Sequence, residues 1–183
     1  MMAWLRFTGA SYGAARAPTL SSAAVLAALD NALLARLRSS DPNAASVNAV
    51  RAFSKLGEHG AIWFALAGAG ALLDADRRPG YAHAAKTVAA AFVVNQAVKQ
   101  AVRRPRPEPA GQLTGTPTQL SYPSTHACTC FAGAGTLSAL LPAPALYALA
   151  VPLALSRLYL GVHHPTDTLA GAVLGASVAE LAR

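Results

Sequence analysis

Apolar residues recur at helical spacing along most of the chain, and polar residues gather in the segments between these runs. After residue 59 the chain has five apolar stretches rich in Ala, Gly and Val. They cover residues 60–73, 81–102, 124–141, 143–162 and 165–181, with prolines or polar and charged residues at their ends. No segment alternates polar and apolar positions as a half-buried strand would. The pattern therefore predicts an all-α protein.

Two further helices are expected before the first of these stretches. In residues 19–37, Leu26, Leu29 and Leu33 lie at helical spacing, while Asp30 and Asn31 interrupt the apolar surface. Residues 41–43 have the composition of a turn and a helix start, and a second helix through residue 56 follows. We expect residues 19–57 to form amphipathic helices on a membrane surface or against a bundle, and residues 1–18 to be flexible.

The composition indicates that this helical protein lies in a membrane. The 183 residues are 54% hydrophobic and only 13% charged, whereas soluble domains carry about 25% charged residues. The five stretches are marginal in length for membrane spans, but their small residues permit close helix packing in lipid. We therefore predict a membrane helix bundle of about five transmembrane helices. Residues 19–183 would form one domain, with residues 58–183 as its catalytic bundle.

Polar and ionisable residues gather at the ends of four of these stretches. Residues 103–123 hold five prolines and no helical periodicity, and a loop of this length in a small domain is usually functional. If the stretches fold as an antiparallel bundle with short connections, this loop and the turn at residues 163–167 lie on one membrane face. That topology brings together Lys99, Arg106, Ser124, Thr125, His126, Arg157, His163 and Asp167.

Such a set is typical of a phosphate site. Arginine binds phosphate oxygens with two donors and lysine adds a point charge. Ser124 and Thr125 at a helix N-terminus would offer backbone N–H groups to an anion. One histidine can attack phosphorus while another protonates the leaving oxygen, and an aspartate one helical turn away can orient the first.

Three motifs at these residues resemble the type 2 phosphatidic acid phosphatase superfamily, which also contains vanadium haloperoxidases. The family patterns K-x6-R-P, P-S-G-H and S-R-x5-H-x3-D appear in order as KQAVRRPRP from residue 99, PSTH from residue 123 and SRLYLGVHHPTD from residue 156. The resemblance implies that His163 is the nucleophile, that Asp167 orients it and that His126 is the general acid. It implies a phosphate-binding role for Lys99, Arg106, Ser124, Thr125 and Arg157.

Several residues depart from the family pattern or are left without a role. Thr125 stands where the family usually has glycine. His164 lies one position off the motif spacing, so we assign it no catalytic role. We interpret Arg103 and Arg104 as helix-end cations that reach lipid head groups. The family needs no metal and no cofactor, and the sequence contains no carboxylate cluster suited to magnesium.

A narrower similarity concerns the substrate. The segments FSKLGEHGAIW from residue 53 and GTPTQLSYPSTHA from residue 115 resemble the short actinobacterial members of the family. These members include a phosphatase that acts on decaprenylphosphoryl-5-phosphoribose in arabinan precursor synthesis. We therefore expect hydrolysis of a polyprenyl-linked phosphomonoester. A polyprenyl diphosphate or phosphatidylglycerophosphate phosphatase is the alternative with the same chemistry. An inactive membrane protein that binds an anion is the alternative outside enzymes.

Charge distribution bears on partners and orientation. The net charge is +7, but the basic residues form no continuous stripe with interleaved aromatics, so nucleic acid is not an expected partner. Outside the motifs, more basic residues flank the site face than the opposite face. The positive-inside rule then predicts a site that faces the cytoplasm of a bacterial plasma membrane.

Overall fold

The computed structural model describes residues 22–37, 43–108 and 111–183, and throughout these residues the chain is built from helices without a β-strand. The helices are α1 (Ser22–Leu37), α2 (Ala44–Lys55), the short 3-10 helix η1 (Glu58–Gly60), α3 (Ala61–Leu73), α4 (Arg78–Val102), α5 (Thr125–Leu137), α6 (Ala143–Tyr159) and α7 (Pro165–Leu181). The predicted all-α fold is confirmed.

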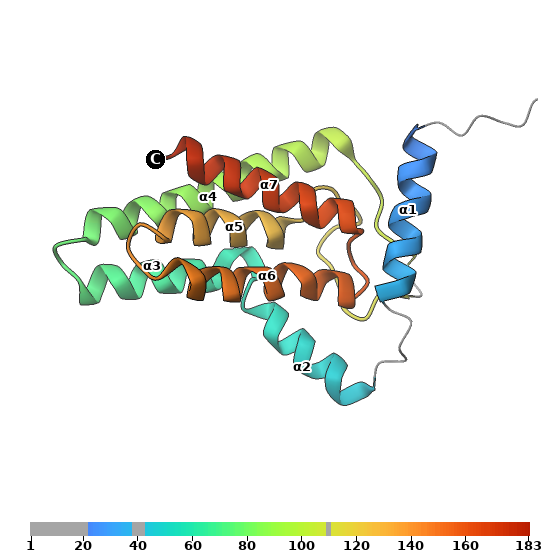
Figure 1. Cartoon of the computed structure of the whole chain (residues 1–183), viewed down its shortest axis with the longest axis horizontal. Helices are drawn as coiled ribbons and strands as arrows, with labels where there is room; N and C mark the ends of the chain where they lie inside the picture. The colour runs from blue at the N-terminus through green and yellow to red at the C-terminus, as the bar shows by residue number, and fades with distance from the viewer. Residues whose placement is uncertain (1–21, 38–42, 109–110) are drawn as a thin grey trace, which may run out of the picture.

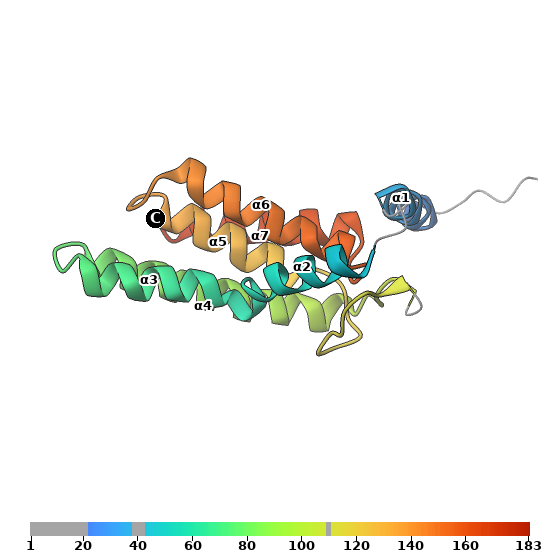
Figure 2. The same cartoon turned by 90° about the horizontal axis from the view of Figure 1, so that it is seen from below.

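Helices α3 to α7 run side by side as a bundle, and α5 lies at its centre (Figures 1 and 2). α5 packs against α4, α6 and α7, while α3 pairs with α4 at one side. Ten of the thirteen residues of α5 are buried. The ends of α4 and α6 and the starts of α5 and α7 therefore lie at one end of the bundle (Figure 1), as the antiparallel topology requires.

Glycines set the close approach of α5 and α7. A Cβ atom placed on Gly171 would lie 2.3 Å from the carbonyl oxygen of Ser124, and one on Gly175 would lie 2.0 Å from that of Cys128. Small residues of this kind let helix backbones approach closely in lipid. This contact holds the first turn of α5 beside the first half of α7.

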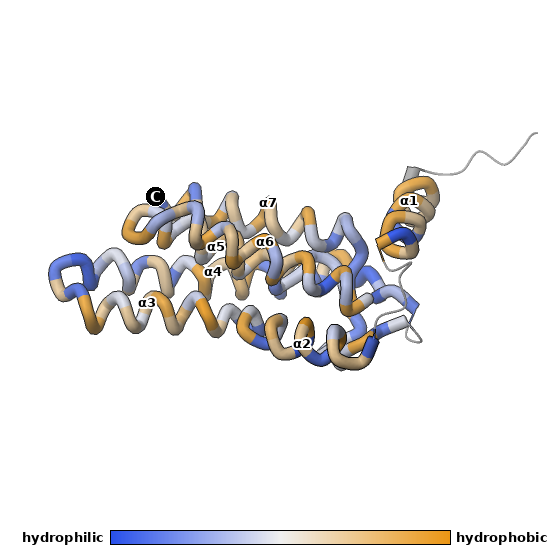
Figure 3. The backbone as a smooth tube through the Cα atoms, turned by 60° about the horizontal axis from the view of Figure 1, so that its bottom comes forward, coloured by the Kyte–Doolittle hydropathy of each residue, from blue (hydrophilic) through white to orange (hydrophobic). Residues whose placement is uncertain are grey.

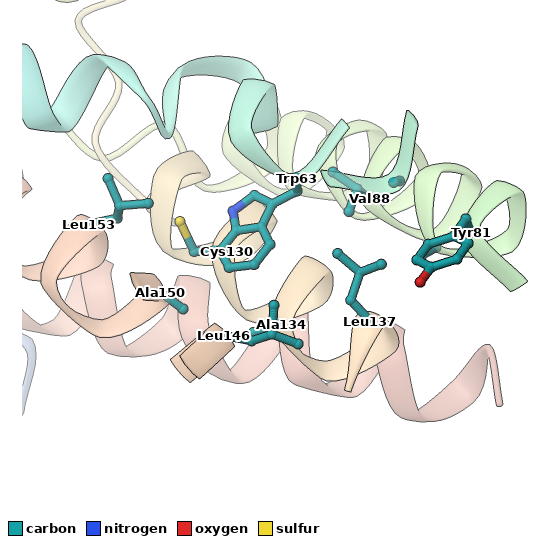
Figure 4. Packing of buried hydrophobic residues seen from close by; sticks show 11 residues of the cluster. Trp63, Tyr81, Val88, Cys130, Ala134, Leu137, Leu146, Ala150 and Leu153 are labelled. Carbon is teal, nitrogen blue, oxygen red and sulfur yellow. The ribbon is translucent and has the colours of Figure 1, made fainter. Parts of the chain in front are cut away.

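The apolar core lies at the middle of the bundle, on the side of α5 away from α7. The indole of Trp63 is fully buried and projects from α3 toward α5, where Cys130 and Ala134 lie (Figure 4). A Cβ atom on Gly133 would lie 2.5 Å from the indole ring. The sequence thus uses small side chains on α5 to accommodate one large aromatic from α3.

The two N-terminal helices lie at the edge of this core, and only Phe53 of α2 is among the described residues that pack against the cluster around Trp63. α2 leaves the bundle at an angle to α3 (Figure 2), because the chain turns at His59 and Gly60, whose φ values are 51° and 79°. α1 crosses the site end of the bundle (Figure 1). It buries Asp30 and Leu34 and leaves Val25, Leu29 and other apolar side chains exposed.

The predicted helix limits agree closely with the structure in the bundle. The stretch expected at residues 124–141 ends as a helix at Leu137, and that expected at 143–162 ends at Tyr159. Asn43, the last residue of the turn expected at residues 41–43, caps α2 by accepting a hydrogen bond from the backbone N–H of Ser46 at 2.8 Å. Residues 41 and 42, the segment 1–18 that we expect to be flexible, and the expected helix start at residue 19 lie outside the described residues.

Length and hydropathy together identify one membrane-spanning candidate among the described residues, Ala44–Leu73, and α6 is apolar but shorter. That candidate includes the turn between α2 and α3. α4 is about 37 Å long at 1.5 Å per residue, against about 30 Å of bilayer hydrocarbon. Hydrophilic positions concentrate at the two ends of the bundle, in the α3–α4 turn and the 103–123 loop (Figure 3). The count of five spans stays a prediction.

The glycine contact between α5 and α7 gives a test of the packing. Gly175→Ala places a methyl group against the Cys128 carbonyl, and such overpacking costs about 1–3 kcal/mol. We expect a lower melting temperature in detergent. Gly68→Ala is the matched control, because nothing lies within 4 Å of its added Cβ. Equal melting temperatures for the two variants would contradict the role assigned to this contact.

Candidate active site

A cavity of about 210 Å³ opens at the end of the bundle where the predicted site residues converge. α2 and η1 form one wall, and α4, the 103–123 loop, α5, α6 and the turn before α7 form the others. Of the predicted site residues, Arg106, Thr125, His126, Arg157 and His163 line the cavity. Lys99, Ser124 and Asp167 lie behind this lining and are buried.

His163 presents one ring nitrogen to an arginine of the loop. Nη1 of Arg106 lies 3.2 Å from Nε2 of His163, and a guanidinium can only donate. The contact therefore assigns the lone pair to Nε2 and the ring proton to Nδ1. Burial lowers the pKa of His163 to about 3, so the ring is neutral near pH 7. An unprotonated ring nitrogen in an anion cavity is equipped to attack phosphorus.

Asp167 lies behind the two histidines with no exposed surface. Its Oδ2 accepts from the backbone N–H of His164 at 2.8 Å and lies 3.1 Å from Nδ1 of the same residue. Nδ1 of His163 is 3.7 Å from Oδ2 and has no hydrogen-bond partner among the described residues. The carboxylate thus contacts His164 more closely than His163, although only His163 lines the catalytic cavity.

Arg104 corrects one sequence interpretation. The sequence favours a cation that reaches lipid head groups, but Nη1 of Arg104 pairs with Oδ1 of Asp167 at 2.9 Å and its Nη2 pairs with Oδ2 of Asp30 at 2.7 Å. Asp30, from α1, is only 2% exposed, and it also accepts from the backbone N–H of Thr166 at 3.0 Å. Two buried carboxylates explain why this guanidinium turns inward.

Ser54 at the end of α2 holds two predicted site residues. Its hydroxyl accepts from Nη1 of Arg157 at 2.8 Å, and its carbonyl accepts from Nε2 of His126 at 3.1 Å. Nε of Arg157 is buried without a hydrogen-bond partner among the described residues. Sequence reasoning missed Ser54, because a small polar residue on an amphipathic helix carries no motif signal.

Lys99 turns to the loop rather than to the cavity. Its ammonium donates to the carbonyls of Pro123 at 2.8 Å, Ser121 at 3.3 Å and Leu120 at 3.4 Å. These contacts hold the chain just before α5. The lysine thus shapes the segment that leads into the second motif.

The first turn of α5 is fixed from two sides. Ser124 caps the helix through its hydroxyl, and its backbone N–H donates to the Asp167 carbonyl at 2.9 Å. The hydroxyl of Thr125 donates to Oδ1 of Asn95 at 2.8 Å. Thr125 therefore keeps its side chain against α4, in the place where the family usually has glycine.

The charged lining defines the class of site. Four Arg and Lys side chains and three histidines line a small cavity, and Glu58 is the one carboxylate among the described lining residues. In the described part of the chain, no three His, Cys, Asp or Glu side chains group as metal ligands. An all-α bundle with such an anion pocket and histidines in its lining is typical of a phosphatase that cleaves phosphate esters.

Comparison with known proteins identifies the family. Residues 80–183 match the PAP2 superfamily, and the chain belongs to this superfamily of phosphatases. The resemblance inferred from the three motifs is thereby confirmed.

Several relatives carry names that specify a substrate. The chain is 44% identical over 125 residues to the decaprenylphosphoryl-5-phosphoribose phosphatase of Mycolicibacterium smegmatis, covering 66% of this chain and 68% of the relative. It is 36% identical over 167 residues to that of Mycobacterium tuberculosis, covering 90% of both. An undecaprenyl-diphosphatase from Sulfolobus acidocaldarius is 38% identical over 100 residues, covering 50% of this chain and 48% of the relative.

Two solved structures share the fold. A transmembrane PAP2-type phosphatidylglycerolphosphate phosphatase from Bacillus subtilis superposes with a TM-score of 0.71 at 23% identity, covering 86% of this chain and 84% of that one. Aquifex aeolicus LpxE superposes with a TM-score of 0.71 at 22% identity, covering 84% and 94%. The bundle is thus the fold of membrane phosphatases.

The ion pair between Asp30 and Arg104 predicts a stabilising role for α1. Asp30→Ala removes the buried carboxylate that accepts from Arg104 and from the Thr166 N–H. A buried donor left without a hydrogen-bond partner lowers the free energy of unfolding by about 1–3 kcal/mol. We expect a lower melting temperature in detergent than for Asn31→Ala, an exposed neighbour on the same helix. If both variants melt like the wild type, α1 does not stabilise the site end of the bundle.

Proposed function

We propose that this phosphatase is an integral membrane enzyme that hydrolyses a phosphomonoester on a polyprenyl-linked substrate, such as decaprenylphosphoryl-5-phosphoribose, through a phosphohistidine. The observation that carries the proposal is the contact between Nη1 of Arg106 and the unprotonated Nε2 of His163. A phosphate bound by Arg106 would lie beside that lone pair. His126 lines the same cavity.

In the proposed mechanism, the arginines bind the phosphate, and the histidines transfer the phosphoryl group and a proton. Arg106 and the unpartnered Nε of Arg157 bind non-bridging phosphate oxygens, and the buried Lys99 adds positive charge from behind. Ser124 and Thr125 support the first turn of α5, whose N-terminus favours an anion. These groups would stabilise the charge that builds up on the transferring phosphoryl group.

Two chemical steps follow from this arrangement. Nε2 of His163 forms a bond to phosphorus as the bond to the substrate oxygen breaks, and His126 gives a proton to that oxygen. Water then attacks the phosphohistidine, His126 takes the proton of the water, and inorganic phosphate leaves with Nε2 free again. The negative charge of Asp167, whose Oδ2 lies 3.7 Å from Nδ1 of His163, stabilises the positive ring of the intermediate. No step uses a metal ion.

The substrate proposal is supported by the relatives and by the size of the cavity. Two relatives above 35% identity are named for decaprenylphosphoryl-5-phosphoribose. The cavity of about 210 Å³ is smaller than the roughly 300–1,000 Å³ of pockets that enclose a whole ligand. It would therefore take a polar head group and leave the isoprenoid chain outside. Hydrolysis of a polyprenyl diphosphate is the second candidate function, because one relative is named an undecaprenyl-diphosphatase.

We also propose that the cavity faces the cytoplasm. The site end of the bundle carries Arg36, Arg51, Lys55 and Arg103 outside the catalytic set, whereas the opposite end carries Arg77, Arg78 and Arg183. Arg104 is left out of this comparison of basic residues, because its guanidinium pairs with buried carboxylates. The positive-inside rule supports the proposed orientation, and labelling a single introduced cysteine beside Lys55 in intact cells would test it.

The nucleophile assignment is tested by substitution. We expect the wild type in detergent to release phosphate from the phosphoribosyl lipid in the presence of EDTA. His163→Ala should abolish release, because no other ring nitrogen of the predicted set faces Arg106. His164→Ala is the matched control and should retain turnover, since His164 does not line the cavity. Full activity of His163→Ala would refute the mechanism.

The general acid is tested with two leaving groups. His126→Ala should lower the rate on an alkyl phosphate by about 10²–10⁴-fold, the usual contribution of general acid–base catalysis. The loss should be smaller on p-nitrophenyl phosphate, whose leaving group needs no proton in the first step. Stopped-flow measurement of nitrophenolate release isolates that step. An equal loss on both substrates would contradict the role of His126 as the acid.

A further inference from the structure

One face of α2 and η1 forms a wall of the cavity that the mechanism does not use. Arg51 and Lys55, four residues apart on one face of α2, line the cavity together with Glu58 at the start of η1. Ser54 lies on the same face and binds Arg157. This wall is therefore fixed directly to the phosphate-binding part of the site.

The cavity carries more positive charge than one phosphate needs. A phosphomonoester has a charge of about −1.5 to −2 near neutral pH, which Arg106 and Arg157 match. Arg51 and Lys55 add two further cations to the lining. Arg51 donates through Nε to the carbonyl of Leu113, and Lys55 is exposed without a hydrogen-bond or ion-pair partner among the described residues. With Glu58 subtracted from the four cations, the lining carries a charge of +3, which still exceeds the charge of one phosphate. The excess favours a second anionic group.

Glu58 gives the wall a different kind of recognition. A carboxylate accepts hydrogen bonds and does not donate, so it repels phosphate oxygens and attracts hydroxyl groups. Gln96 from α4 and Thr114 from the loop line the same cavity and can each donate and accept. A polar, hydroxyl-bearing unit fits this lining better than a second phosphate directly bonded to the first.

We propose that Arg51, Lys55 and Glu58 form a head-group subsite of the substrate. Arg51 and Lys55 bind a second phosphate, and Glu58 accepts hydrogen bonds from the hydroxyls of a sugar that separates the two phosphates. This inference rests on the proposed function and adds the residues that select a phosphorylated sugar head group over a diphosphate.

Selectivity ratios measure this subsite. The substrates are a short-chain polyprenylphosphoryl-5-phosphoribose, the polyprenyl diphosphate of the same chain, and p-nitrophenyl phosphate. For Lys55→Ala, the ratio of kcat/KM on the phosphoribosyl lipid to that on p-nitrophenyl phosphate should fall about tenfold, or about 1.4 kcal/mol. For Glu58→Gln, the ratio of the phosphoribosyl lipid to the diphosphate should fall about tenfold. Lys86→Ala, exposed on α4 away from the cavity, is the control.

The outcomes separate the two levels of the proposal. If the wild type hydrolyses the phosphoribosyl lipid and both variants keep wild-type ratios, the subsite is wrong and the proposed function stands. If the wild type hydrolyses no lipid substrate, the proposed function fails and the subsite fails with it. A fall in the first ratio for Lys55→Ala and in the second for Glu58→Gln, absent in the control, supports the subsite.

Discussion

The site end of the bundle depends on one buried carboxylate. Burying an ion costs several kcal/mol unless charges and hydrogen bonds compensate it, and Asp167 is compensated by Arg104 and by the N–H of His164. Its backbone carbonyl also receives the N–H of Ser124. Since these partners come from the loop, α7 and α5, satisfying one charge fixes the relative position of the elements that carry the histidines. Arg104 extends the same set of bonds to Asp30 in α1.

The 103–123 loop is shaped by cations that bind backbone carbonyls. Lys99 donates to three backbone carbonyls near the C-terminal end of the loop. Arg106 donates to the carbonyls of Thr118 at 2.8 Å and Val162 at 2.6 Å. A proline-rich segment forms few backbone hydrogen bonds of its own, so its carbonyls are free to accept. The basic residues of the motifs therefore organise the loop before any substrate is present.

Sequence reasoning succeeded where the signal is periodic or local. The apolar stretches predicted the bundle helices, and the topology predicted that one end would gather the motifs, where Arg106 indeed contacts His163. It failed for Arg104, because an arginine at a helix end has the same sequence signal whether it reaches lipid or buried carboxylates that lie 63 and 74 residues away. It also missed Ser54 and could not place Lys99 behind the cavity. The positions of Arg104, Ser54 and Lys99 each depend on a contact with a residue far away in the sequence. The spacing of residues within a motif carries no information about such contacts.

The break between α2 and α3 at His59 and Gly60 separates two tasks within one small chain. The residues shared with the superfamily begin at residue 80, after α2 and η1, and contain all three motifs. α2 and the start of η1, which precede the break, supply the cavity wall proposed as the head-group subsite but no motif residue. Phe53 of α2 packs against the core around Trp63, whereas Arg51 and Lys55 of the same helix are exposed and line the cavity. If these two residues form the proposed subsite, substituting them would change head-group recognition without altering the core or the three motifs.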